Sequence, residues 1–215
     1  MAKPAKFNGS EYLAAFRTTR RFKNLFLLVL VLCLLAQLTA YVLVVHVGVV
    51  DAIHSIEPPS QEAQAAASGY ETVFMLLLPW TQFVGFVSGI LLTLTISFTA
   101  RISLVDRLGG VAGFVRAMFW TLLAAAMVTP WQTLLELPYA WGALTDYIEL
   151  LTATADIRPA WGGLASKTEL YITTARLVAY PALALVALVV AQISFMQGYR
   201  RLGTAEAAGS GGAKV

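Results

Sequence analysis

The sequence from Asn24 to Val50 contains no charged residue. An apolar stretch of more than about 18 residues without charges is long enough to cross the hydrocarbon of a bilayer as one helix. A basic segment precedes this stretch, as it does in a secretory signal, but the apolar core of a signal is only about 7 to 15 residues long. We therefore predict that residues 24–50 stay in the membrane as an uncleaved signal anchor.

Three further apolar stretches have the length of a membrane span. Composition agrees with them, because 58% hydrophobic residues, 13% charged residues and a mean hydropathy of +0.71 exceed what a water-soluble chain of 215 residues could bury. We predict an all-α polytopic membrane protein with a four-transmembrane-helix bundle. It would form a single membrane domain at residues 1–202, with spans at about 24–50, 73–100, 111–135 and 174–199, followed by a disordered cytoplasmic tail at 203–215 that is rich in Gly and Ala.

Two short amphipathic segments lie outside these spans. Between Ser10 and Phe22, apolar side chains share one helical face and arginines follow, which predicts a short N-terminal interfacial helix or, alternatively, a docking helix for a partner. Between Tyr147 and Leu151, apolar residues flank Glu149, and Asp146 precedes them. This pattern predicts a short amphipathic outer-face helix that rests on the membrane surface.

The charged residues separate by side of the membrane. All basic residues except Arg158, Lys167 and Arg176 fall near the N-terminus, near the turn between the second and third spans, or in the tail. All acidic residues except Glu11, Asp106 and Glu206 fall on the other connections. By the positive-inside rule, we expect a multi-pass protein of a bacterial-type inner (plasma) membrane with cytoplasmic N- and C-termini.

The basic residues also indicate what the chain contacts. The net charge of +3 comes from clusters beside apolar runs, where Lys and Arg meet anionic lipid head groups. We expect the lipid bilayer as a partner, with bound lipid, and no binding of nucleic acid.

Small residues recur at helical spacing in the second, third and fourth spans. Such residues allow two helices to approach closely, either within one chain or between subunits. The candidate packing residues are Gly85, Gly89, Gly109, Gly113, Ala184, Ala187, Ala191, Ser194 and Gly198. A polar residue inside the first span, Gln37, should also face other helices, because an unpaired amide in hydrocarbon is costly.

Two Pro-Trp pairs point to a polar site near the outer mouth of the bundle. The second and third spans run in opposite directions, so Pro79-Trp80 and Pro130-Trp131 lie towards the same side. Trp131 should anchor at the head groups, whereas Trp80, roughly 10 Å deeper, should form a buried kink. The candidate polar site consists of Trp80, Gln82, Gln132 and Glu136.

A metal site is a weaker candidate. On one helix, His46, Asp51, His54 and Glu57 would fall within roughly 140° of each other, and imidazole and carboxylate are ligands for zinc, copper or iron. An interfacial histidine beside a solvated acidic loop explains the same residues, and we favour it. The single cysteine, Cys33, excludes an intramolecular disulfide. No cofactor is predicted.

The sequence favours packing over catalysis. It carries no glycine-rich phosphate loop, and its ionisable residues fall near span ends, so we expect an uncharged hydrocarbon core. The first hypothesis is a non-catalytic membrane subunit or scaffold, not an enzyme, that packs through the small-residue seams into a homo-oligomer or with other membrane-protein subunits. The alternatives are a channel or small-solute transporter with a site near the outer mouth, and a metal-binding membrane protein.

Overall fold

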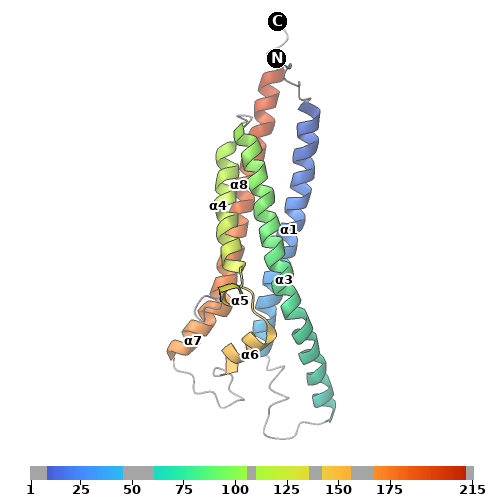
Figure 1. The fold of residues 1–215 in the computed structure, drawn as a ribbon, viewed down its shortest axis with the longest axis vertical. Helices are drawn as coiled ribbons and strands as arrows, with labels where there is room; N and C mark the ends of the chain where they lie inside the picture. Colours follow the sequence, from blue (N-terminus) through green and yellow to red (C-terminus); the bar gives the residue numbers. More distant parts are fainter. Residues whose placement is uncertain (1–8, 46–60, 106–109, 136–141, 156–166, 212–215) are drawn as a thin grey trace.

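The computed structural model describes residues 9–45, 61–105, 110–135, 142–155 and 167–211 (Figure 1). Within these ranges the secondary structure is helical. The helices are α1 (Gly9–Val45), α3 (Gln61–Val105), α4 (Val111–Val128), α5 (Trp131–Leu135), α6 (Tyr147–Ala155), α7 (Lys167–Thr174), the π-helical η2 (Ala175–Ala179) and α8 (Tyr180–Gly211).

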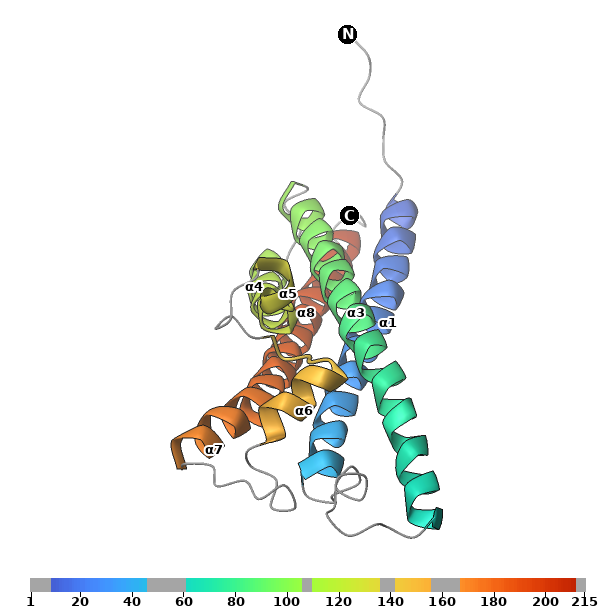
Figure 2. The same ribbon diagram turned by 60° about the horizontal axis from the view of Figure 1, so that its bottom comes forward.

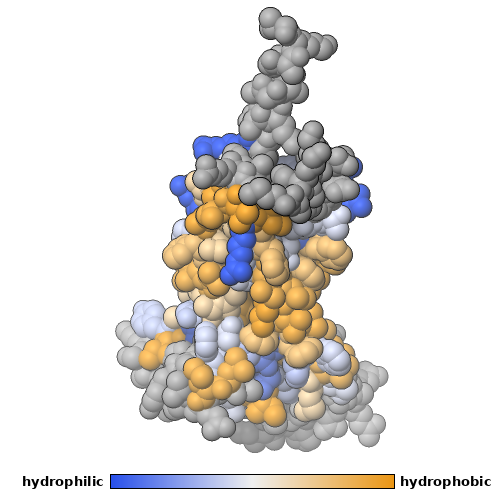
Figure 3. Space-filling model, turned by 45° about the horizontal axis from the view of Figure 1, so that its top comes forward, coloured by the Kyte–Doolittle hydropathy of each residue, from blue (hydrophilic) through white to orange (hydrophobic). Residues whose placement is uncertain are grey.

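Four of the described helical segments are long and apolar enough to cross a membrane. They are Arg17–Val45, Thr72–Val105, Val111–Val128 and Tyr171–Arg201. A band of hydrophobic residues separates two more hydrophilic ends of the molecule (Figure 3). The predicted all-α, four-span, multi-pass membrane protein is therefore confirmed.

The two ends of the bundle differ in charge. The start of α1, the turn into α4 and the end of α8 lie together at one end (Figure 1). We call this the basic end, because Arg17, Arg20, Arg21, Arg200 and Arg201 belong to it. The opposite end carries α6, and we call it the α6 end.

Two helices are longer than predicted. The N-terminal helix is continuous with the first span in α1, because no Gly or Pro interrupts residues 10–45. At the other terminus, α8 continues to Gly211, so most of the segment 203–215 expected to be a disordered tail is helical. Ala and Glu in this segment are good helix formers, which explains the extension.

The third span is shorter than predicted, ending at Val128 rather than near residue 135. Thr129 has extended backbone angles, with φ −60° and ψ 128°, because it precedes Pro130 and the proline ring disfavours a helical conformation there. The 18 residues of α4 rise about 27 Å, slightly less than the hydrocarbon thickness of about 30 Å. The apolar side chains that α1 and α3 present beyond the end of α4 therefore need another partner.

That partner is α6. The larger core cluster joins α1, α3, α4 and α8 through residues such as Leu34, Leu92, Phe114 and Leu188. A second cluster at the α6 end joins α1, α3, α6 and η2, and consists of Ala40, Tyr41, Val44, Phe74, Leu78, Tyr147, Leu150 and Leu177. In the second cluster α6 thus holds the position that α4 holds in the first. Figure 2 shows α6 between α7 and α3.

The small-residue seams join helices of the same chain. Ala184, Ala187, Ala191 and Ser194 are buried. A Cβ added at Gly113 would lie 2.6 Å from the backbone nitrogen of Gly198, so α4 and α8 touch backbone to backbone. On α3, Gly85 faces Leu144 and Cys33, and Gly89 faces Ala125. These positions therefore leave no free face for a second chain, and Gly109 lies outside the described residues.

Candidate functional site

The site begins at the end of α4, where Pro130 interrupts the helical hydrogen bonds. Proline has no N–H, so the carbonyl of Ala126 cannot receive its usual bond from residue 130. The indole Nε1 of Trp131 donates to this oxygen instead, at 2.7 Å. The indole N–H of Trp131 thus caps the end of α4 in place of the missing backbone N–H.

The segment 142–146 packs directly on this helix end. The backbone N–H of Ala143 donates to the carbonyl of Met127, at 2.6 Å. A Cβ at Gly142 would lie 2.5 Å from the carbonyl oxygen of Thr129, so only glycine fits this contact without a shift. The chain is therefore tied to α4 immediately before it enters α6.

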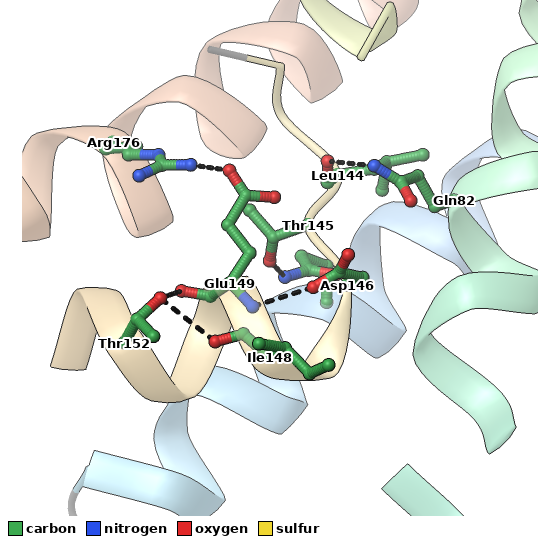
Figure 4. A network of polar contacts seen from close by, with 9 residues as sticks. Gln82, Leu144, Thr145, Asp146, Ile148, Glu149, Thr152 and Arg176 are labelled. Carbon is green, nitrogen blue, oxygen red and sulfur yellow. Dashed lines mark hydrogen bonds and ion pairs between the residues drawn. The ribbon is translucent and has the colours of Figure 1, made fainter. Parts of the chain in front are cut away.

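Two glutamines from separate spans bind the same segment. Gln37 of α1 donates through Nε2 to Thr145 Oγ1. Gln82 of α3 donates through Nε2 to the carbonyl of Leu144 in a long hydrogen bond of 3.4 Å (Figure 4). Gln37 is 1% exposed, which confirms that it faces the bundle. Its Oε1 has no hydrogen-bond partner within the part of the chain that the structure describes.

An ion pair fixes α6 on its other side. Arg176 of η2 points towards α6 and contacts Glu149 through its guanidinium (Figure 4). The two side chains are only 11% and 21% exposed. Because water has little access, this pair is screened less than a surface ion pair.

The π-helical turn of η2 sets the direction of Arg176. At 100° per residue, a regular α-helix would place Arg176 about 20° from Ala187, on the face that packs against α4. The N–H of Tyr180 instead bonds to the carbonyl of Ala175, and this wider turn adds one residue directly before Pro181. One added residue rotates the helix before the turn, including Arg176, by about 100° relative to α8. Arg176 therefore turns away from the α4 face.

Asp146 caps α6. Its Oδ1 accepts a 2.7 Å hydrogen bond from the backbone N–H of Glu149. Burial raises the pKa of the Asp146 carboxyl, and a backbone hydrogen bond with Ile148 opposes this shift. A raised pKa means that the ionised form is less favourable in the folded state than in the unfolded state. The destabilisation is complete above the raised pKa and is relieved as pH falls through it towards the unfolded value.

The paired variants Asp146→Asn and Asp146→Ala separate the cap from the charge. We expect Asp146→Ala to lower the free energy of unfolding by about 1 kcal/mol, because the cap is lost. Asp146→Asn keeps the acceptor, so its stability should stay within a few tenths of a kcal/mol of the wild type. Thermal unfolding in detergent between pH 7 and pH 4 measures both effects. The wild type should gain stability relative to Asp146→Asn on acidification, and the opposite trend would contradict the assignment.

We predicted that α6 rests on the membrane surface. Its apolar face is instead buried in the bundle. Tyr147 and Leu150 are buried, and the Tyr147 ring stacks on Phe74 with centroids 6.5 Å apart. Ile148 projects outward and is exposed. The early end of α4 explains the difference, because it leaves apolar surface on α1 and α3 that α6 covers.

Of the four residues of the predicted polar site, the structure describes the side chains of Trp80 and Gln82. Gln82 lies in the network described above, but Trp80 is 61% exposed on the outside of the bundle, so it is not a buried kink. The side chain of Gln132 and all of Glu136 lie outside the described residues. The structure adds Gln37, Thr145, Glu149 and Arg176 as companions of Gln82.

The metal candidates His46, Asp51, His54 and Glu57 also lie outside the described residues. Within the described ranges, no group of three or more His, Cys, Asp or Glu side chains could hold a metal ion.

The fold and this site define a four-span helical membrane protein in which a separate helix completes a short third span. No protein-family model, no curated protein and no solved structure matches the chain.

Proposed function

We propose that the chain is a non-catalytic integral membrane subunit or scaffold, working in a homo-oligomer or a larger complex of a bacterial-type inner membrane with both termini cytoplasmic. The supporting observation is that polar side chains at the α6 end hold one segment of the chain in place. Gln37, Gln82 and Arg176, from three different spans, all hold the segment 142–155. Leu144, Tyr147 and Leu150 of this segment are buried. Such an arrangement keeps one surface at the membrane boundary in a fixed position, which suits a scaffold.

Contacts with partners would use faces other than the small-residue seams, since those seams are occupied within the chain. Large apolar side chains stay exposed along α3, among them Phe83 and Phe98, and along α8, including Leu183. These faces meet lipid or a neighbouring membrane subunit.

Mass measurement after mild extraction tests this proposal. Native membranes are crosslinked, solubilised in a mild detergent, and the particle that contains the chain is weighed. We expect a discrete assembly well above the 23.2 kDa of one chain. Phe83→Ala on α3 and Leu183→Ala on α8 alter exposed positions outside the core, so comparing them locates the contact face. A particle that remains a lone monomer under the mildest conditions would contradict the proposal.

A small-solute channel or transporter is the second candidate, and one observation favours it. The Oε1 of Gln37 is a buried acceptor without a partner in the described residues, close to the segment that Gln82 also binds. A hydrogen-bonding solute could use that acceptor. Vesicle swelling with glycerol and urea tests this, and Gln37→Leu should lower the permeability. Wild-type vesicles no more permeable than empty ones would remove the candidate for these solutes.

A further inference from the structure

At the basic end, α1 and α8 meet through cations that lie over aromatic rings. The guanidinium carbon of Arg20 lies 5.1 Å from the ring centroid of Tyr199. One turn deeper, Lys23 Nζ lies 4.5 Å from the ring centroid of Phe195 and donates a hydrogen bond to Gln192 Oε1. Two positive charges therefore follow each other along a single helix contact, which we call the α1–α8 seam.

The deeper of these charges is fully enclosed. Lys23 is 1% exposed, although the sequence placed it in the basic segment before the first span. Its partners in the described structure are an amide oxygen and an aromatic ring, both neutral. Burying an ammonium is costly unless an opposite charge lies nearby, and the neighbouring Arg20 is a like charge. The seam would gain stability from an anion.

The surroundings of the seam add positive charge. Arg17, Arg21 and Arg200 are exposed at this end. The sequence places only Glu11, Asp106 and Glu206 among the acidic residues on this side, so basic residues outnumber acidic ones whatever the exact side-chain positions. The anion that the seam favours must therefore come largely from outside the chain.

The level of the seam in the molecule identifies the anion. Phe22 and Leu25 are large, apolar and exposed directly beside Arg21. In Figure 3, hydrophilic residues border the apolar band at this end. Cations that border a lipid-facing apolar surface lie at the depth of lipid phosphates, whereas a soluble acidic partner would meet a surface without this apolar border.

We propose that the α1–α8 seam binds the phosphate of an acidic phospholipid, with Arg20 as the principal ligand and Arg21 and Arg200 beside it. The Arg20 guanidinium lies over the Tyr199 ring, with its central carbon 5.1 Å from the ring centroid. This ring contact leaves N–H groups for the paired hydrogen bonds that guanidinium forms with phosphate. The bound phosphate also offsets the repulsion between Arg20 and the enclosed Lys23.

Thermal unfolding of the full-length chain in neutral detergent tests the site. Phosphatidylglycerol, phosphatidylcholine and inorganic phosphate are added at equal phosphate concentration. We expect phosphatidylglycerol to raise Tm by at least about 3 °C, because a ligand of the folded state stabilises it, and the other two to leave Tm unchanged. Arg20→Gln and Arg200→Gln should each remove at least half of the shift. The control Arg116→Gln removes an exposed cation from α4, which lies across α8 from α1, and should keep the shift.

Each alternative gives a different result. An equal shift with inorganic phosphate would mean a free-anion site and overturn the lipid assignment. An equal loss in Arg116→Gln would mean diffuse attraction rather than a seam site, and no shift with phosphatidylglycerol would remove the proposal. If Arg20→Gln does not fold, mass spectrometry of the intact wild-type protein counts retained lipid. Retention of phosphatidylglycerol over phosphatidylcholine supports the site, and equal retention contradicts it.

Discussion

Replacing Gly113 with alanine is expected to lower the free energy of unfolding by about 2 kcal/mol or more, even though alanine is the better helix former by about 1 kcal/mol. The added Cβ would lie 2.6 Å and 2.7 Å from the backbone N and Cα of Gly198, and 2.8 Å from the carbonyl oxygen of Ser194. These are backbone atoms, so no side chain can rotate away. The two helices α4 and α8 would have to separate along their whole contact.

Gly89→Ala is the matched control for Gly113→Ala. It is the same substitution in a neighbouring helix contact, but its Cβ would lie 3.9 Å from Ala125, an ordinary van der Waals distance. We expect the stability to be unchanged or to rise by up to about 1 kcal/mol from helix propensity. Unfolding of both variants in mixed micelles with increasing dodecyl sulfate measures the difference. Equal stability of the two variants would show that α4 and α8 are not in backbone contact.

Arg176→Met should produce the other large effect. Removing one partner of an enclosed ion pair leaves the remaining charge in a poorly hydrated position, and we expect a loss of about 3 kcal/mol. The double variant Arg176→Met with Glu149→Met removes both charges and keeps apolar volume. It should therefore be more stable than Arg176→Met alone. A double variant that is as unstable as the sum of its single variants would show that the pair is not coupled.

A reporter cysteine shows where the Arg176→Met effect acts. Leu150 is buried on α6, so Leu150→Cys in a Cys33→Ala background should react slowly with a polar thiol reagent. Adding Arg176→Met should speed this reaction, because α6 loses one of its attachments. An exposed cysteine at Thr152 on the same helix serves as the control, and its rate should not change.

Features encoded in a single stretch of chain could be predicted from the sequence. Each span is a long apolar run, and the inward direction of Gln37 follows from the cost of an amide in lipid. The spacing of the small residues from Ala184 to Gly198 predicts a close helix contact, although spacing alone does not distinguish a partner in the same chain from one in another chain.

The seating of α6 depends on relations between distant residues. Gln82 binds the carbonyl of Leu144, and Arg176 reaches Glu149 only because of a π-helical turn, which has no propensity signal. One boundary does have a local signal: Thr129 precedes Pro130, and this pair marks the end of α4. The roles of Gln132, Glu136 and the histidine-containing segment stay predictions.

The distribution of the attachments of α6 along the chain implies an order of assembly. The segment 142–155 is synthesised after α1 and α3 but before η2 and α8, so Gln37 and Gln82 can reach it before Arg176 exists. Until the last span is inserted, the ion pair between Arg176 and Glu149 cannot form, and the covering contact of Leu177 is missing from the second core cluster. The docking of α6 is therefore completed only when the C-terminal helix enters the membrane. Insertion of that helix is then the last step of folding.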